Sequence, residues 1–329
     1  MPLLSPTKAR SLILTRALPE QLMRRISSCY TAWANPEDRP LTSDELVQAA
    51  NELKSEIVFV TAFDRLSATV IADLPHSVRV IGTLSVGHEH IDLAAASARG
   101  LTVLHTPDIL SDAVTEMAML LLLGAARRAH EGAELLYSGR WRGWSPTQLL
   151  GTDVTDARIG IFGMGRIGQV IARRAARGFD MRVHYHNRNR LPPEIEEGAT
   201  FHATADGLLA VSDFLVLAAP STPETKGFLN EAALARLPAG AIVVNIARGD
   251  LVDDEALIAA LRSGHVAAAG LDVFNNEPQI HEGYKRLPNV FLQPHQGSST
   301  KGTRVRMGEL LLDSIEDFLA GKSVGNRLA

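Results

Sequence analysis

The sequence feature that most constrains the fold is a glycine-rich turn, Gly163–Gly168, with the pattern G-x-G-x-x-G. The turn follows the apolar run Ile159–Phe162 and precedes a helix-like segment that begins at Gln169. In such a strand–turn–helix unit the first glycine permits the tight turn, the second lets the backbone approach a pyrophosphate, and the third lets helix and strand pack closely. A bare glycine-rich turn needs no ligand, but this context favours a dinucleotide-binding parallel sheet covered by helices.

Short β-like runs alternate with helix-like segments along most of the chain, which is typical of α/β proteins. The alternation occurs once from Ser11 to Leu104 and again from Arg158 to Leu292. A length of 329 residues also indicates about two domains. We therefore predict an α/β protein with two doubly wound parallel sheets. The expected strands are Ser11–Thr15, Ile57–Thr61, Val78–Gly82, Thr102–Leu104, Ile159–Phe162, Arg182–His186, Phe214–Ala218, Ala241–Asn245, Ala267–Leu271 and Val290–Leu292.

The segment between the two stretches has a different pattern. Ser111–Tyr137 contains no proline and no glycine before Gly124, and we expect one long helix, buried in a core or an interface. The loop that follows holds Trp141 and Trp144, whose rings need a partner subunit or a substrate pocket to be buried.

Composition and charge exclude several classes of protein. A hydrophobic fraction of 46% excludes a disordered chain, and a net charge of −4 gives no reason to expect a nucleic acid or an anionic membrane as partner. The single cysteine, Cys29, forms no intrachain disulfide and fits a reducing compartment. Met1–Arg10 lacks a secretory signal pattern, and the apolar run Met117–Ala126 is shorter than the ~20 residues of a membrane span. We expect a soluble cytoplasmic protein.

The stretch Arg182–Arg190 bears on the choice of dinucleotide. NAD-binding domains place an acidic residue about 20 residues after the glycine turn, where it binds the ribose 2′-hydroxyl. This stretch contains no acid, whereas Arg188 and Arg190 can neutralise a 2′-phosphate and Asn187 can donate a hydrogen bond to it. The pattern favours NADPH, and a solvated basic loop that also accepts NADH remains the alternative.

Three polar side chains follow expected strands of the second stretch. Arg248 follows Ala241–Asn245, Glu277 follows Ala267–Leu271, and His295 follows Val290–Leu292, so all three belong to the edge where α/β sheets bind ligands. Singly, each has an ordinary structural explanation. Together they supply a carboxylate anchor, an orienting base and a titratable proton donor.

These motifs, in this order, resemble the D-isomer-specific 2-hydroxyacid dehydrogenase family over nearly the whole chain. Within the family, Tyr185–Arg188 and the tryptophan loop are most similar to NADPH-dependent glyoxylate/hydroxypyruvate reductases. The matching segments are Leu84–Gly87 with Ile91–Asp92, Gly163–Gly168, Ala219–Thr225, Asn245–Asp250, Asp272–Pro278 and Pro294–Ser298.

The resemblance implies hydride transfer to C2 of a small 2-oxo acid, with His295 as proton donor, Glu277 holding the imidazole in its charged form, and Arg248 binding the substrate carboxylate. The remaining implied substrate-binding residues are Ser85, Val86, Gly87 and Trp144. The implied cofactor-binding residues are Thr115, Gly163, Gly165, Arg166, Ile167, Gly168, Asn187, Arg188, Ala219, Pro220, Thr225, Ile246, Ala247, Asp272, His295 and Gly297.

The resemblance also implies the domain organisation. Residues 1–104 and 299–329 would form a flavodoxin-like substrate domain, and residues 105–298 an inserted Rossmann coenzyme domain, with the active site in the cleft between them. A homodimer through the coenzyme domains is implied, in which Trp144, with Trp141 as the less favoured alternative, reaches the neighbour's substrate pocket.

The expected activity is NADPH-dependent reduction of glyoxylate and hydroxypyruvate to glycolate and D-glycerate. Two alternatives remain: a dehydrogenase for bulkier 2-oxo acids or one linked to NAD, and a non-catalytic NAD(P)-sensing scaffold. Formate dehydrogenation is disfavoured, because that activity pairs the catalytic histidine with glutamine and here Glu277 is an acid.

The tripeptide His88-Glu89-His90 suggests a metal site at first sight. The side chains of residues i and i+2 do not converge on a helix and no third histidine is near in sequence, so we expect no metal. The tripeptide departs from the family pattern beside the substrate-carboxylate loop, where it bears on substrate choice.

Overall fold

The structure is a computed structural model that describes residues 10–329. The expectation that Met1–Arg10 carries no secretory signal concerns residues that lie almost entirely outside this range. The chain divides into two compact units, one that runs to Leu110 and includes Ser299–Ala329, and one formed by Ser111–Ser298. The boundary therefore lies a few residues later than the expected end at residue 104. The reason is that His105 N–H donates to the Asn326 carbonyl at 3.1 Å and Thr106 N–H donates to the Ser85 carbonyl at 2.9 Å, within the first unit.

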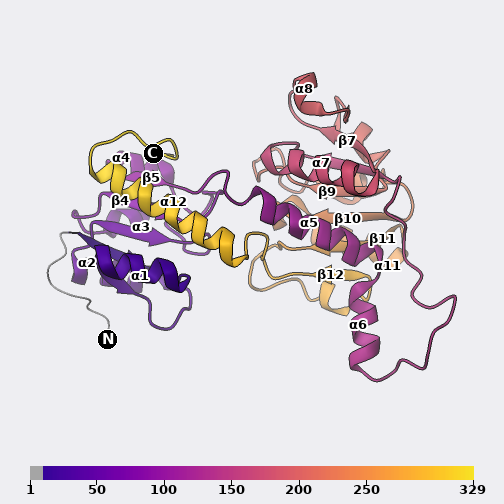
Figure 1. Ribbon diagram of the computed structural model, residues 1–329, viewed down its shortest axis with the longest axis horizontal. Coiled ribbons are helices and arrows are strands. Elements are labelled where there is room, and N and C mark those ends of the chain that lie inside the picture. Colours follow the sequence, from indigo (N-terminus) through magenta and orange to yellow (C-terminus); the bar gives the residue numbers. More distant parts are fainter. Residues whose placement is uncertain (1–9) are drawn as a thin grey trace. The chain divides into compact units, whose positions relative to one another are not determined.

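The first unit is a five-stranded parallel sheet with strand order β2-β1-β3-β4-β5 (Figure 1). The completely buried run of β3 is typical of a parallel strand covered on both faces by helices. Its strands are β1 (Ser11–Leu14), β2 (Thr31–Ala34), β3 (Ile57–Val60), β4 (Val80–Thr83) and β5 (Thr102–Leu104). Its helices are α1 (Glu20–Cys29), α2 (Ser43–Leu53), α3 (Ala68–Asp73), α4 (Leu93–Ala98) and α12 (Lys301–Leu319).

The second unit is a seven-stranded parallel sheet with strand order β12-β11-β10-β9-β6-β7-β8, in which the order reverses between β6 and β9. That reversal is where doubly wound sheets bind their ligands. Its strands are β6 (Arg158–Phe162), β7 (Arg182–His186), β8 (Thr200–Phe201), β9 (Phe214–Leu217), β10 (Ala241–Asn245), β11 (Val266–Leu271) and β12 (Val290–Leu292). Its helices are α5 (Ser111–Ala126), α6 (Ala129–Tyr137), α7 (Arg166–Phe179), α8 (Pro193–Glu196), α9 (Ala205–Leu209), α10 (Glu231–Leu234) and α11 (Asp254–Ser263), with short 3₁₀ turns at Gly249–Leu251 and Tyr284–Arg286.

The two parallel sheets confirm the predicted fold class, but two details differ. The expected single helix over Ser111–Tyr137 is wrong, because Arg128 adopts a left-handed backbone (φ 53°) and separates α5 from α6. The Arg128 guanidinium donates to Glu131 at 2.6 and 2.8 Å, which stabilises the break. Strands β2 and β8 were not predicted; β8 has only two residues.

Among the helices in residues 10–329, none is both long enough and apolar enough to cross a membrane.

Candidate functional site

Each glycine in the turn at the end of β6 has a structural role of its own. Gly163 has φ of +99°, and a Cβ there would stand 2.5 Å from the Ala219 amide nitrogen. A Cβ on Gly168 would stand 2.5 Å from the Gly163 carbonyl oxygen, so α7 packs closely on the turn. Gly165 faces open space, and the first turn of α7 has neither a side-chain cap nor an acid. A helix N-terminus left in this state favours an anion, and the turn fits a pyrophosphate.

Asn187, at the end of β7, clamps this turn. Its Oδ1 accepts the Met164 N–H at 2.7 Å and its Nδ2 donates to the Met164 carbonyl at 3.3 Å. In this structure the amide fixes the shape of the glycine turn, and its expected contact with a ribose phosphate stays a prediction.

The two arginines that follow have different surroundings. Arg190 donates from Nε and Nη2 to both carboxylate oxygens of Glu196, each at 2.9 Å, so its charge is already compensated. The Tyr185 hydroxyl also donates to Glu196. The pKa of the buried Glu196 is lowered to about 2, chiefly by Arg190 and then by Tyr185. Arg188 is exposed, and its charge contributes to lowering the pKa of Glu224 across the loop after β9.

The remaining expected cofactor residues of this unit lie at or near the same edge of the sheet. Thr225 closes the loop after β9, because its Oγ1 donates to the Pro220 carbonyl at 2.7 Å and accepts the Thr222 N–H at 2.8 Å. Thr115 is buried in α5 and its hydroxyl donates to the Ser111 carbonyl at 2.8 Å. Ala219, Ile246 and Ala247 are buried, whereas Pro220 and Arg166 are exposed and Ile167 is half-buried.

Glu277 and His295 form a hydrogen-bonded pair at the ends of β11 and β12. Glu277 Oε2 lies 2.6 Å from His295 Nδ1, and Oε1 accepts the Phe274 N–H at 2.7 Å. Both carboxylate oxygens are engaged, so the carboxylate has a fixed orientation and fixes the imidazole in turn. The imidazole is 31% exposed and the carboxylate 17% exposed, which leaves the histidine the more accessible partner.

Asp272 shapes the turn that carries His295. Its carboxylate accepts the N–H groups of Gln296 and Gly297, each at 2.7 Å, and its carbonyl accepts the His295 N–H at 2.8 Å. Burial raises the pKa of Asp272 and the two amide hydrogen bonds oppose that rise. In this structure Asp272 fixes the backbone at and after His295, and the cofactor contact that the resemblance implies for Asp272 and Gly297 stays a prediction.

Arg248 follows β10, the strand next to β11. Its position depends on Asn245, whose Oδ1 accepts the Ala247 N–H at 3.0 Å and whose Nδ2 donates to the Arg248 carbonyl at 2.9 Å. Gly249 then packs on the Phe274 carbonyl with no room for a Cβ. Arg248, Glu277 and His295 therefore come from three adjacent strand ends of one sheet.

The segment Ser85–Gly87 lies in the first unit, after β4, and its three carbonyl groups are all occupied. Ser85 O accepts the Thr106 N–H at 2.9 Å, Val86 O lies 3.0 Å from His105 Nδ1, and Gly87 O accepts the Ser85 hydroxyl at 2.7 Å. Within residues 10–329, the N–H groups of Val86 and Gly87 donate to no protein acceptor. The segment thus offers backbone donors, which suits a carboxylate.

Trp144 is 82% exposed and Trp141 50% exposed, both in the loop between α6 and β6. The Trp144 ring is therefore not buried in this structure, and the partner subunit that would cover it stays a prediction.

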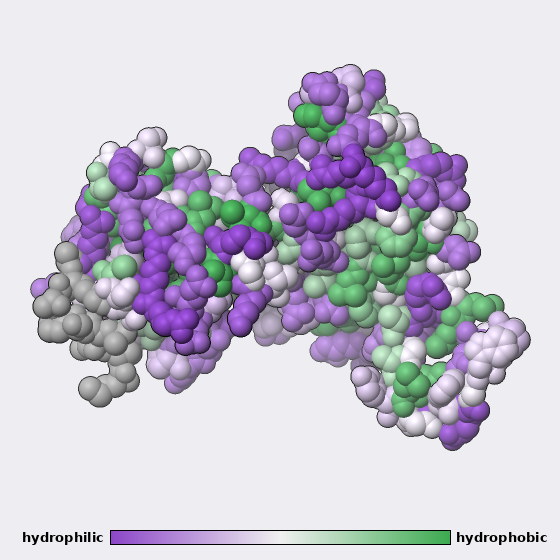
Figure 2. All heavy atoms as spheres, in the orientation of Figure 1, coloured by the Kyte–Doolittle hydropathy of each residue, from purple (hydrophilic) through white to green (hydrophobic). Residues whose placement is uncertain are grey.

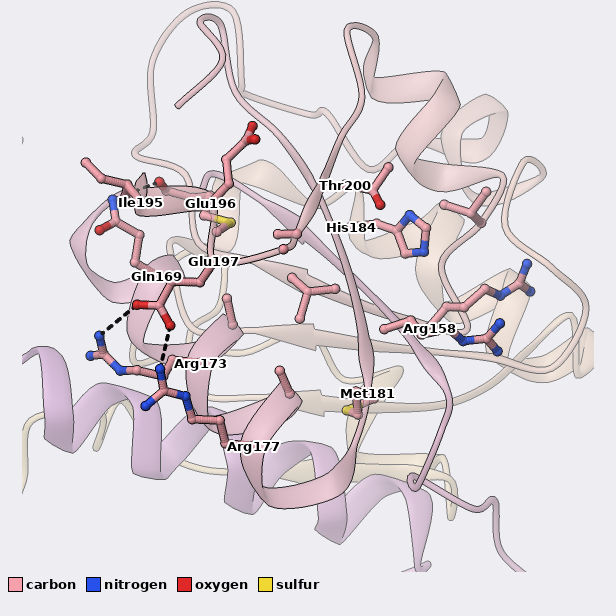
Figure 3. Close-up of a pocket in the computed structure, with 18 of the residues that line it drawn as sticks. Arg158, Gln169, Arg173, Arg177, Met181, His184, Ile195, Glu196, Glu197 and Thr200 are labelled. Carbon is pink, nitrogen blue, oxygen red and sulfur yellow. Dashed lines mark hydrogen bonds and ion pairs between the residues drawn. The ribbon is translucent and has the colours of Figure 1, made fainter. Parts of the chain in front are cut away.

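A cavity of about 890 Å³ lies on another part of the second unit, between α7, α8 and the edge strands β7 and β8 (Figure 3). Arg173 and Arg177 line it and both pair with Glu197, at 3.8 and 2.9 Å, as the dashed lines show (Figure 3). One carboxylate therefore serves two guanidinium groups, and their positive charges are compensated only in part.

Sequence reasoning missed two residues that shape the site. Asn245 ends a buried strand, and an asparagine at such a position often forms a turn in which its side chain hydrogen-bonds to the backbone of the residues that follow. Glu196 is an acid in a short acidic helix, and nothing local indicates that it reaches Tyr185 and Arg190.

Comparisons with known proteins agree with this arrangement. Residues 119–297 match the family model of the D-isomer specific 2-hydroxyacid dehydrogenase NAD binding domain. The chain is 43% identical over 322 residues to glycerate dehydrogenase of Hyphomicrobium methylovorum, covering 97% of this chain and 99% of the relative. It is 40% identical over 314 residues to glyoxylate reductase of Thermococcus kodakarensis, covering 94% and 93%.

One solved structure supports the same grouping and another bears on the cofactor. A D-isomer specific 2-hydroxyacid dehydrogenase structure from Polaromonas has a TM-score of 0.93 and 49% identity, covering 97% of this chain and 99% of its own. The NADPH-dependent glyoxylate/hydroxypyruvate reductase of Sinorhizobium meliloti, solved with NADP and malonate, has a TM-score of 0.83 and 29% identity, covering 97% of each chain.

Proposed function

The chain belongs to the D-isomer specific 2-hydroxyacid dehydrogenase family and is an NAD(P)-dependent oxidoreductase, and from this premise we propose that it reduces glyoxylate and hydroxypyruvate with NADPH. The observation that carries the proposal is the 2.6 Å hydrogen bond between Glu277 and His295, next to the strand end that bears Arg248. The products are glycolate and D-glycerate.

The nicotinamide, when bound, supplies hydride to C2 of the 2-oxo acid. Glu277 holds His295 at Nδ1, which leaves Nε2 as the nitrogen that donates a proton to the carbonyl oxygen. A carboxylate in contact with an imidazole favours its charged form, which is the proton-donating form.

Substrate binding has two components. Arg248 provides a planar cation for the carboxylate and carbonyl oxygens of the 2-oxo acid. The donor segment Ser85–Gly87 provides backbone N–H groups, which suit a substrate carboxylate.

The preference for NADPH is proposed from the loop after β7. That loop contains no acid to bind a 2′-hydroxyl, and the exposed Arg188 is the cation available for a 2′-phosphate. The Sinorhizobium meliloti relative is NADPH-dependent by its name.

The test follows reduced-nicotinamide absorbance with glyoxylate or hydroxypyruvate, using NADPH and NADH in parallel, for the wild type and His295→Ala. Rapid oxidation with an NADPH preference, lost in His295→Ala by about 10²–10⁴-fold while NADPH still binds, supports the proposal. Faster oxidation of NADH contradicts the cofactor assignment, and retained turnover in His295→Ala removes it as the acid. If NADPH or NADH is oxidised only with bulkier 2-oxo acids, the protein is a dehydrogenase for those acids. If neither cofactor is oxidised with any 2-oxo acid, the non-catalytic scaffold replaces the proposal.

We also propose that the protein forms a homodimer through its second unit. Apolar atoms gather over α5 and extend toward α6 (Figure 2), and Leu120, Leu136 and Leu150 are 46%, 61% and 64% exposed. An exposed apolar surface of this kind marks an interaction site. A neighbouring subunit would also cover Trp144. The cytoplasmic location stays a prediction.

A further inference from the structure

The segment Ser85–Gly87 is held by a chain of side-chain hydrogen bonds that starts at His90. His90 Nε2 lies 2.9 Å from Thr83 Oγ1, Thr83 Oγ1 lies 2.8 Å from Ser85 Oγ, and Ser85 Oγ lies 2.7 Å from the Gly87 carbonyl oxygen. Thr83 is fully buried and Ser85 is 7% exposed, so water does not compete easily for these hydroxyl groups.

The direction of every bond in this chain follows from proton counting. A carbonyl oxygen only accepts, so the single Ser85 hydroxyl proton goes to Gly87. Ser85 Oγ must then accept the Thr83 hydroxyl proton, and Thr83 Oγ1 must accept from His90. His90 therefore carries a proton on Nε2 and is the donor at the head of the chain.

His90 is itself anchored at its backbone. Its carbonyl accepts the Leu66 N–H at 2.8 Å, and the next residue, Ile91, is buried and bridges to Leu66. The preceding residues His88 and Glu89 are exposed, while His90 is half-buried and bonds inward to Thr83. The three side chains thus point to different surroundings, and only the third belongs to the chain of bonds.

We propose that His90 is a positioning residue for substrate binding, which acts through Thr83 and Ser85 to hold the backbone donors of Val86 and Gly87 toward the substrate carboxylate. This rests on the proposed function, because it takes Ser85–Gly87 as the carboxylate site. With the carbonyl of Gly87 held by Ser85, the peptide groups of the segment keep one orientation, and their N–H groups are pre-organised for an anion.

The first experiment measures steady-state kinetics of the full chain with glyoxylate and NADPH. His90→Leu removes the donor and should raise KM for glyoxylate about five- to tenfold, the equivalent of one hydrogen bond, with kcat and KM for NADPH little changed. His90→Gln keeps an N–H donor and should recover most of the loss. His76→Leu, the same change at an exposed histidine of the first unit that belongs to no expected site, is the matched control and should behave as the wild type.

A double-mutant cycle tests whether the effect passes through Thr83. Thr83→Val interrupts the same chain of hydrogen bonds, so adding His90→Leu to Thr83→Val should raise KM little further. If the two residues acted independently, the factors by which each substitution raises KM would multiply. A multiplied effect, or an equal KM for His90→Leu and His76→Leu, would overturn the proposal. If Thr83→Val fails to fold, Thr83→Ser retains the hydroxyl, and its KM should stay near the wild-type value while its response to His90→Leu stays full.

Hydrogen exchange separates this proposal from the function on which it rests. Amide exchange of the peptide that contains Ser85–Gly87 should be faster in His90→Leu than in His76→Leu, with or without activity. Faster exchange without a change in KM would confirm the hydrogen-bond chain, refute its substrate role and contradict the carboxylate site of the proposed function. Unchanged exchange would refute the positioning role even in a fully active enzyme.

Discussion

Gly249 and Phe274 pack backbone against backbone, so that a Cβ on Gly249 would overlap the Phe274 carbonyl group. The contact joins the residue after Arg248 to the segment whose Phe274 N–H binds Glu277. The positions of the anchor and of the base are therefore coupled through the main chain.

Gly249→Ala should separate these two segments. Neither carbonyl nor amide can yield as a flexible side chain would, so we expect a loss of about 1–3 kcal/mol of stability, typical of overpacking, and a lower kcat/KM. Thermal unfolding and steady-state kinetics measure the two effects. Gly178→Ala is the control, because a Cβ there meets nothing within 4 Å; equal behaviour of the two variants would show that the contact has no role.

Glu277→Gln should move the alkaline limb of the pH–rate profile to lower pH and reduce kcat about ten- to a hundredfold. The amide keeps the approximate shape but removes the negative charge 2.6 Å from His295 Nδ1 that favours the imidazolium. The profile of kcat/KM against pH is the measurement. Glu282→Gln, at an exposed acid that pairs with Lys285, serves as control. An unshifted profile in Glu277→Gln would mean that this acid is not coupled to the proton donor.

The fold and the three catalytic candidates could be predicted from the sequence because their signals are local. β10 is an unbroken buried strand, and strand ends in a parallel sheet share one edge, so residues that follow them come together. The glycine turn follows the same logic, since Gly163 and Gly168 have no room for a side chain.

The remaining features depend on contacts between residues that are distant in sequence, or on segments that are too short to leave a sequence pattern. The break at Arg128 involves no glycine or proline and depends on a left-handed arginine paired with Glu131. The hydrogen bonds of Asn187 to the glycine turn could not be predicted, because its partner, Met164, lies on another strand–helix turn. The sequence indicated only that the tripeptide His88–His90 bears on substrate choice; the contact of His90 with Thr83 could not be predicted, since only the folded loop brings the two side chains together.

Arg188→Ala should weaken NADPH binding about ten- to a hundredfold and NADH binding little, because a charge-assisted hydrogen bond to a 2′-phosphate is lost. Arg190→Ala is the informative comparison. Its guanidinium is already held by Glu196 at 2.9 Å, so we expect a much smaller effect on the NADPH-to-NADH ratio. Titration of both cofactors measures the ratio. Equal losses for NADPH and NADH in Arg188→Ala would refute the 2′-phosphate assignment.

Leu136→Glu should convert a dimer to a monomer, because it places a charge on the exposed apolar surface of α5 and α6. Light scattering on the eluted protein reports the mass. Ile195→Glu, at a 40% exposed residue of α8, controls for the added acid. A wild-type chain that is already monomeric, or a dimer that persists in Leu136→Glu, would contradict the proposed interface.

Glu196 should make the stability of the second unit depend on pH. The pKa of Glu196 falls from 4.5 to about 2, because Arg190 and then Tyr185 donate hydrogen bonds to the carboxylate. A lowered pKa in the folded state means that the pair stabilises the fold fully above the unfolded value and loses this effect as the pH falls toward 2. Glu196→Gln should therefore lower the urea midpoint at pH 7, and its difference from the wild type should shrink below about pH 4. Glu194→Gln, at an exposed acid of the same helix, should show no such difference; a gap between Glu196→Gln and the wild type that stays constant down to low pH would assign the loss to packing and not to the charge.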